Sequence, residues 1–153
     1  VQQHRHVQYV ARAKQPPVQA AAALFVGESA TMASESVVLG TPAIYIDEVG
    51  RGYTDEEARE QLLWMYRPVP SRDELKPNEP EWIAGGVKEC IEKAEEIASS
   101  SFDTTQYAQR HKNWIATKID CTAFLTWFIE HYPQSAEQTK ANQDNAEFWA
   151  QFR

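Results

Sequence analysis

The chain has few cysteines and no long apolar run, and each absence excludes a class of protein. Its two cysteines, Cys90 and Cys121, are too few for a disulfide framework, so we expect reduced, buried thiols in a cytoplasmic protein. No apolar run approaches the roughly 20 residues that a membrane-spanning helix needs, so no span is expected. The opening residues, VQQHRHVQYV, are polar and do not resemble the apolar core of a signal peptide.

Basic clusters and metal-ligand spacings are also missing. The net charge is −7 and no run is rich in lysine or arginine, which argues against a nucleic-acid partner, because such partners need clustered cations. His4 and His6 fall on different faces of a helix and have no cysteine or carboxylate nearby, so no metal site is expected. A length of 153 residues with 42% hydrophobic residues is sufficient for one globular core.

The first half of the chain alternates strand and helix patterns. Five consecutive apolar residues, Ala22–Val26, favour a strand at Leu24–Val26 that is buried on both faces, as in parallel sheets. A short helix is predicted at Thr31–Leu39, ending at Gly40. Ala43–Ile46 is then a second buried strand. A strand–helix–strand unit of this length predicts a right-handed parallel crossover.

The remaining elements follow from similar signals. Thr54 and Glu57 fit a T-x-x-E capping box that would open a helix, and a third strand is predicted at Leu63–Tyr66. Further helices are expected at His4–Lys14 (closed by Pro16 and Pro17), Glu81–Ala98, Thr104–Lys118 and Cys121–Tyr132. The fold class is therefore α/β, a partial Rossmann-like parallel sheet over residues 1–98 followed by a helical extension over 99–153. Because three strands are few and the chain begins at Val1, we expect a piece of a longer protein.

The turn between the first strand and its helix contains the candidate site. Gly27 lets the backbone bend, and Ser29 can cap the helix or donate its hydroxyl to a phosphate. Ala30 and Thr31 occupy the first helical turn, where backbone N–H groups are unpaired and the helix dipole attracts anions. Glu35 lies one turn later on the same face, where a carboxylate can accept both hydroxyls of a ribose. The alternative is that Ser29 is only an N-cap and Glu35 only a solvated residue.

The segment GESATMASESVVLGTPAIYI resembles the nucleotide-sugar-binding half of GT-B enzymes. Ser29, Glu35 and Gly40-Thr41-Pro42 are similar to the S-G-G-x-x-x-E-x-x-x-x-G-x-P run of the non-hydrolysing UDP-N-acetylglucosamine 2-epimerases. A similar run, one residue longer, occurs in the N-acetylglucosaminyltransferase that makes lipid II. The segment resembles more closely an uncharacterised prokaryotic family with G-x-x-x-T-M-x-x-E-x-x-x-x-G-T-P. The resemblance extends through GRGYTDEE and KIDCTAFLTWFIEHYPQS, over residues 18–135.

The resemblance implies a role for each matching residue. Ser29, Ala30 and Thr31 would face a diphosphate, and Glu35 would bind the ribose. Arg51, in a segment similar to the R-x-x-T-E motif bordering the sugar–phosphate site of the epimerases, would offer a forked donor to a phosphate. A surface position for Arg51 is the alternative.

The function implied is that of the C-terminal part of a GT-B-like glycosyltransferase or sugar-nucleotide 2-epimerase in surface-polysaccharide synthesis. The partner would be a nucleotide sugar, most simply a UDP sugar, with no metal or other cofactor. The chain would be inactive without an N-terminal domain, on which the cluster of Phe148, Trp149 and Phe152 could pack, unless that cluster forms a homodimer contact. Ala30 in place of glycine and the charge of Glu28 fit the alternative of a non-catalytic scaffold that has lost nucleotide binding.

Overall fold

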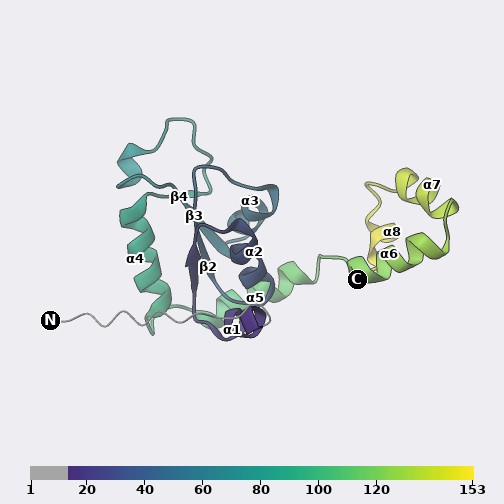
Figure 1. The fold of residues 1–153 in the computed structure, drawn as a ribbon, viewed down its shortest axis with the longest axis horizontal. Helices are drawn as coiled ribbons and strands as arrows, with labels where there is room; N and C mark the ends of the chain where they lie inside the picture. Colours follow the sequence, from purple (N-terminus) through teal and green to yellow (C-terminus); the bar gives the residue numbers. More distant parts are fainter. Residues whose placement is uncertain (1–13) are drawn as a thin grey trace. The chain divides into compact units, whose positions relative to one another are not determined.

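A four-stranded parallel sheet forms the centre of the computed structural model, which describes residues 14–153 (Figure 1). The strands lie in the order β1 (Phe25–Gly27), β2 (Ala43–Ile46), β3 (Leu63–Tyr66) and β4 (Ile83–Gly85), and each pairs in parallel with its neighbour. The α/β class and a parallel, Rossmann-like sheet are therefore confirmed. The helix expected at His4–Lys14 and the two histidines in it fall outside the described residues, apart from Lys14.

Helices cover both faces of this sheet (Figure 1). Helices α2 (Ala30–Val38) and α3 (Gly52–Arg59) pack together on one face, and α4 (Val87–Ala98) covers the other. Successive side chains of β2 point to opposite faces, so Ile44 joins Tyr66, Cys90 and Ile97 in a core beneath α4. Ala43, Ile44 and Tyr45 are all buried, as expected for a central strand of a parallel sheet.

Strand β1 is an edge strand, and the expectation that it is buried on both faces was wrong. It lies outermost in the sheet, and the side chain of Val26 is 49% exposed. A run of five apolar residues has no periodicity that would distinguish an edge strand from a central strand. The central strands are β2 and β3, whose predicted bounds agree with the structure.

The segment predicted as one helix, Glu81–Ala98, contains β4 followed by α4. Gly85 has a φ of +150°, which stops the extended strand, and Gly86 is the N-cap of the helix. Val87 and Ile91 of α4 are 42% and 54% exposed, whereas Cys90 and Ile97 are buried. The glycine pair was the signal for this break, because glycine is the residue that tolerates such a backbone turn.

Two helix starts also differ from the prediction. Helix α1 (Gln15–Ala21) begins at the prolines that were expected to end a helix, since proline fits the first turn, where its missing N–H is not needed. Helix α3 begins at Gly52, so Thr54 is its third residue and not its cap. The Thr54 hydroxyl accepts from the N–H of Arg51 at 2.9 Å. The capping box proposed for Thr54 and Glu57 is therefore wrong.

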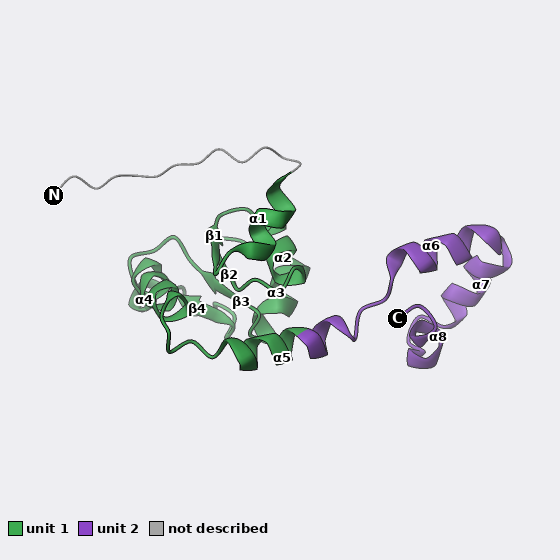
Figure 2. Cartoon of the chain, turned by 90° about the horizontal axis from the view of Figure 1, so that it is seen from below, with its two compact units in different colours: residues 1–111 green, residues 112–153 purple. Residues whose placement is uncertain are grey.

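The chain divides into two compact units, the first ending at His111 and the second comprising Lys112–Arg153 (Figure 2). The division falls within α5 (Thr104–Ile115), whereas the expected boundary followed Ala98. Tyr107 of α5 belongs to the first unit, where its hydroxyl donates to the carbonyl of Leu62 at 3.1 Å. Within residues 14–153, no helix has both the length and the apolar character needed to cross a bilayer.

The second unit is held together by aromatic rings. It contains α6 (Cys121–Glu130), whose N-cap is Asp120, then α7 (Gln134–Ala141) and α8 (Ala146–Ala150). Phe152 and Trp149 lie 5.3 and 5.4 Å from the ring of Phe124 on α6. The C-terminal aromatic cluster thus packs against α6 of its own unit. Its contact with another domain or with a second copy stays a prediction.

Candidate functional site

The turn after β1 places a helix N-terminus at the carboxyl edge of the sheet. Ser29 is the N-cap of α2, and its hydroxyl oxygen accepts from the N–H of Met32 at 3.3 Å. The amides of Ala30 and Thr31 have no acceptor within the helix, as in the first turn of any helix. The N-cap interpretation of Ser29 is therefore confirmed, and it leaves these two amides directed at the turn.

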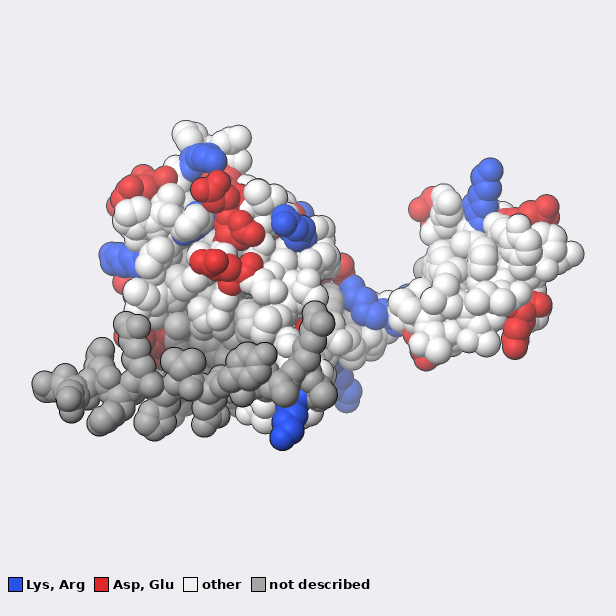
Figure 3. All heavy atoms as spheres, in the orientation of Figure 1, with Lys and Arg blue, Asp and Glu red and all other residues white. Residues whose placement is uncertain are grey.

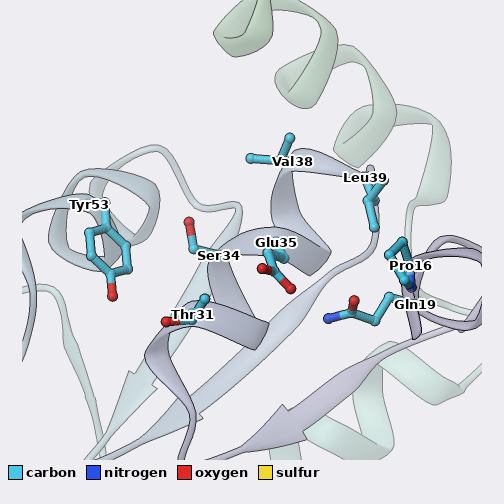
Figure 4. Close-up of a pocket in the computed structure, with 8 residues that line it drawn as sticks. All are labelled: Pro16, Gln19, Thr31, Ser34, Glu35, Val38, Leu39 and Tyr53. Atoms are coloured by element: carbon cyan, nitrogen blue, oxygen red, sulfur yellow. The ribbon is translucent and has the colours of Figure 1, made fainter. Parts of the chain in front are cut away.

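A groove runs over the outer face of α2, between α1 and α3 (Figure 4). We call this cavity of about 490 Å³ the α2 groove; its lining residues are Pro16, Gln19, Thr31, Ser34, Glu35, Val38, Leu39 and Tyr53. A second hollow of about 400 Å³ shares Thr31 and Glu35 with it and reaches Ser29 at the helix start. Together they form a continuous surface of the size that small-molecule sites require.

Some of the predicted site residues come together here and others do not. Ser29, Thr31 and Glu35 line the two hollows, with the carboxylate of Glu35 in the middle of the view in Figure 4. Gly27 and Ala30 form the backbone of the turn without lining either hollow. Arg51 precedes α3, is exposed and donates from Nη1 to the carbonyl of Gly50 at 3.1 Å.

The N-terminus of α2 differs electrostatically from that of α4. At α4 the helix carries its own anion, because a carboxylate oxygen of Glu89 accepts from the N–H of Gly86 at 2.9 Å. The backbone N–H groups of Gly86 and Arg72, which both donate to this oxygen, hold the pKa of Glu89 below its ordinary value. The first turn of α2 contains no acidic residue. Its positive end is therefore not neutralised by a side chain of the helix itself.

Three polar residues of the α2 groove were not identified from the sequence. Gln19 reaches in from α1, Ser34 lies between Glu35 and Tyr53, and Tyr53 lines the groove from α3 (Figure 4). The Ser34 hydroxyl lies 2.5 Å from a carboxylate oxygen of Glu57, which is 1% exposed. No local motif marks Ser34 or Gln19, since their positions depend on how α1 and α3 pack against α2.

Polar side chains at the ends of β2 and β3 bind one another. The Tyr45 hydroxyl donates to Asp47 at 2.7 Å, and burial followed by this carboxylate raises the pKa of Tyr45 to about 12. The same hydrogen bond keeps the pKa of Asp47 below its ordinary value. Arg67 donates to Glu79 at 2.7 Å and to the carbonyl of Asp47 at 2.8 Å. The polar cluster of Tyr45, Asp47, Arg67 and Glu79 therefore has a structural role, because its donors and acceptors are paired with one another.

Within the described residues, the two thiols and the acidic side chains are candidates for a second site. Cys90 is buried, and burial raises its pKa, whereas Cys121 is exposed, so the expectation of two buried thiols was wrong for Cys121. Residues 14–153 contain no group of three or more histidine, cysteine or acidic side chains that could hold a metal ion. On the face shown in Figure 3, acidic side chains gather on the upper part of the first unit, with basic ones standing singly between them.

Comparison with known proteins gives no match to any family model, curated protein or solved structure. The geometry of the α2 groove and of the turn beside it therefore carries the functional argument.

Proposed function

We propose that this chain binds a nucleotide sugar, most simply a UDP sugar, at the N-terminus of α2 and along the α2 groove. The observation that carries the proposal is the continuous surface from Ser29 through Thr31 to Glu35, beside a helix start without an acidic residue of its own. A diphosphate would accept from the amides of the first turn. Glu35, one turn further, would accept a hydrogen bond from the ribose, and the apolar end at Val38 and Leu39 would contact the base.

The reaction proposed for the whole protein is glycosyl transfer or 2-epimerisation of the bound sugar in surface-polysaccharide synthesis. The support is the likeness of the Ser29–Pro42 run to the motif of the 2-epimerases, now seen as a strand–turn–helix–strand unit with Gly40 at a φ of +88°. In this proposal the acceptor side comes from another domain. The chain alone is expected to bind without turning over.

The test is calorimetric titration of UDP and UDP-N-acetylglucosamine into the chain. Glu35→Ala and Ser29→Ala are each expected to weaken saturable binding by about 1.5 kcal/mol or more, the lower end of the range for a hydrogen bond to a charged group. Glu95→Ala, an exposed acid on α4, is the matched control and should bind as the parent does. Glu28→Gln should strengthen binding, because it removes a negative charge beside the diphosphate.

Absence of binding by a chain whose fold is verified by circular dichroism would refute this proposal. The non-catalytic scaffold is the alternative that such a result would favour. Its C-terminal aromatic cluster, however, is engaged inside the second unit, with Phe152 only 5% exposed. A scaffold would therefore need a different surface.

A further inference from the structure

The hydroxyl of Ser34 can only accept hydrogen bonds from a molecule in the α2 groove. A serine hydroxyl has one proton, and that of Ser34 is donated to Glu57 at 2.5 Å. Glu57 is 1% exposed, so water does not compete with Ser34 for its carboxylate oxygen. Ser34 lines the groove next to Glu35, so the lone pairs of its hydroxyl oxygen can accept a hydrogen bond from a ligand there.

Gln19 is a second residue of the α2 groove with an acceptor oxygen. Its side-chain nitrogen donates to the carbonyl of Met32 at 3.0 Å and to the hydroxyl of Ser36 at 3.1 Å, which fixes the orientation of the amide. Gln19 is 6% exposed, and its side-chain oxygen has no hydrogen-bond partner in the described part of the chain. A buried acceptor in this state is destabilising unless a donor reaches it.

The groove carries negative charge, which also favours a ligand that donates hydrogen bonds to Ser34 and Gln19. Among residues 14–153, those that line it include the carboxylate of Glu35 but neither lysine nor arginine. An anionic group would be repelled from Glu35, whereas a group that presents O–H donors would be attracted. The diphosphate must therefore stay at the helix start, and a neutral group with hydroxyls must occupy the groove.

We propose that Ser34 is a specificity-determining residue that accepts a hydrogen bond from a ligand hydroxyl beside the one held by Glu35, with Glu57 as its positioning residue. This inference rests on the proposed function, since it names the ribose as the group in the groove. It assigns the two neighbouring hydroxyls of that ribose to two neighbouring acceptors, Ser34 and Glu35.

The experiment compares UDP, 2′-deoxy-UDP and 3′-deoxy-UDP by calorimetry on the parent chain and on Ser34→Ala. We expect Ser34→Ala to weaken UDP binding roughly two- to tenfold, the range for one neutral hydrogen bond. One of the two deoxy ligands lacks the hydroxyl that Ser34 binds, and Ser34→Ala should not change the affinity of that ligand. The other deoxy ligand keeps this hydroxyl, and Ser34→Ala should weaken its binding as much as it weakens the binding of UDP. Ser34→Thr, which keeps the hydroxyl, should restore the parent's discrimination.

The outcomes separate this inference from the proposed function. If the folded parent chain does not bind UDP, both are overturned. If the parent binds UDP and Ser34→Ala binds it equally well, or loses the same factor for all three ligands, only the role of Ser34 is overturned. A uniform loss would mean that Ser34 acts through the packing of α2 on α3.

Glu57 is tested by the same discrimination between ligands, which a purely structural role would not change. Glu57→Met removes the acceptor for the Ser34 proton, so the ratio of UDP to deoxy-UDP affinity should fall toward that of Ser34→Ala. Glu57→Gln keeps an acceptor oxygen and should retain the parent ratio. Thermal unfolding of each variant verifies that it is folded, and an unchanged ratio in a folded Glu57→Met would overturn the positioning role.

Discussion

The ion pair between Arg67 and Glu79 is expected to be a major contributor to the stability of the first unit. Arg67 donates from Nε at 2.9 Å and from Nη2 at 2.7 Å to one carboxylate oxygen of Glu79. The side chains are 9% and 14% exposed, so little water can replace either partner. Truncating Glu79 leaves two guanidinium donors without their acceptor, while the third contact, to the carbonyl of Asp47, remains.

The magnitude follows from this geometry. Breaking a fully buried pair by removing one partner costs about 3–5 kcal/mol, and a hydrogen bond to a charged group contributes about 1.5–3 kcal/mol. Because Arg67 keeps one bond and Glu79 is slightly exposed, we expect Glu79→Ala to lower the free energy of unfolding by about 2–3 kcal/mol. The double variant Arg67→Met/Glu79→Met should cost less, since it leaves no unpaired charge.

Urea unfolding monitored by tryptophan fluorescence and circular dichroism measures these differences. The matched control is Glu96→Ala, which removes the exposed Lys93–Glu96 pair, whose side chains are 24% and 52% exposed. Its expected cost is below about 1 kcal/mol. If Glu79→Ala costs no more than Glu96→Ala, or the double variant costs more than Glu79→Ala alone, the reasoning is refuted.

The pH dependence of the same variant gives an independent check. The hydrogen bonds from Arg67 hold the pKa of Glu79 below its ordinary value of 4.5. A carboxyl group with a lowered folded pKa contributes stability that is complete above its unfolded pKa and is lost as the pH falls through the folded pKa. The difference in unfolding free energy between parent and Glu79→Ala should therefore be constant from pH 7 to pH 5 and shrink below 4.5. A difference that does not change with pH would contradict this assignment.

Two further predictions concern a helix end and the thiols. Gly40→Ala should lower the unfolding free energy by about 1–2 kcal/mol, because a residue with a Cβ is disfavoured at a φ of +88°; urea unfolding measures this, and a neutral result would refute it. In the native protein a thiol reagent should modify exposed Cys121 rapidly and buried Cys90 only after denaturation; mass spectrometry of peptides distinguishes the two, and equal rates would contradict the burial.

The strands that could be predicted from the sequence are those with distinct local signals. Strands β2 and β3 are short apolar runs between polar turns, and their predicted bounds agree with the structure because both are central and buried. The edge position of β1 could not be predicted, since the order of strands depends on long-range pairing. Strand β4 was missed because Trp82-Ile83-Ala84 also fits the apolar periodicity of the helix that follows.

The residues of the candidate site could likewise be predicted only where local spacing determines their positions. Ser29 as the cap and Glu35 one turn later depend on local spacing, and the structure has both on α2. The contact between Ser34 and Glu57 joins residues 23 positions apart, and it exists only because α3 packs against α2. Gln19 could be assigned to the groove only once Pro16 and Pro17 were understood as the beginning of a helix and not its end.

The carboxyl ends of the four parallel strands bring polar and charged groups to one edge of the sheet. Hydrogen bonds and ion pairs among these groups determine which of them are available to a ligand. At β3 the guanidinium of Arg67 is bound by Glu79, and at β4 the N–H of Gly86 is bound by Glu89. At β2 the side chain of Asp47 is bound by Tyr45. Only the turn after β1 combines, within the described residues, a helix start without its own anion and an adjoining groove. At the other three strand ends a ligand would first have to displace a bound side chain, whereas after β1 it would meet the exposed carboxylate of Glu28, so the anion site proposed above is placed at α2.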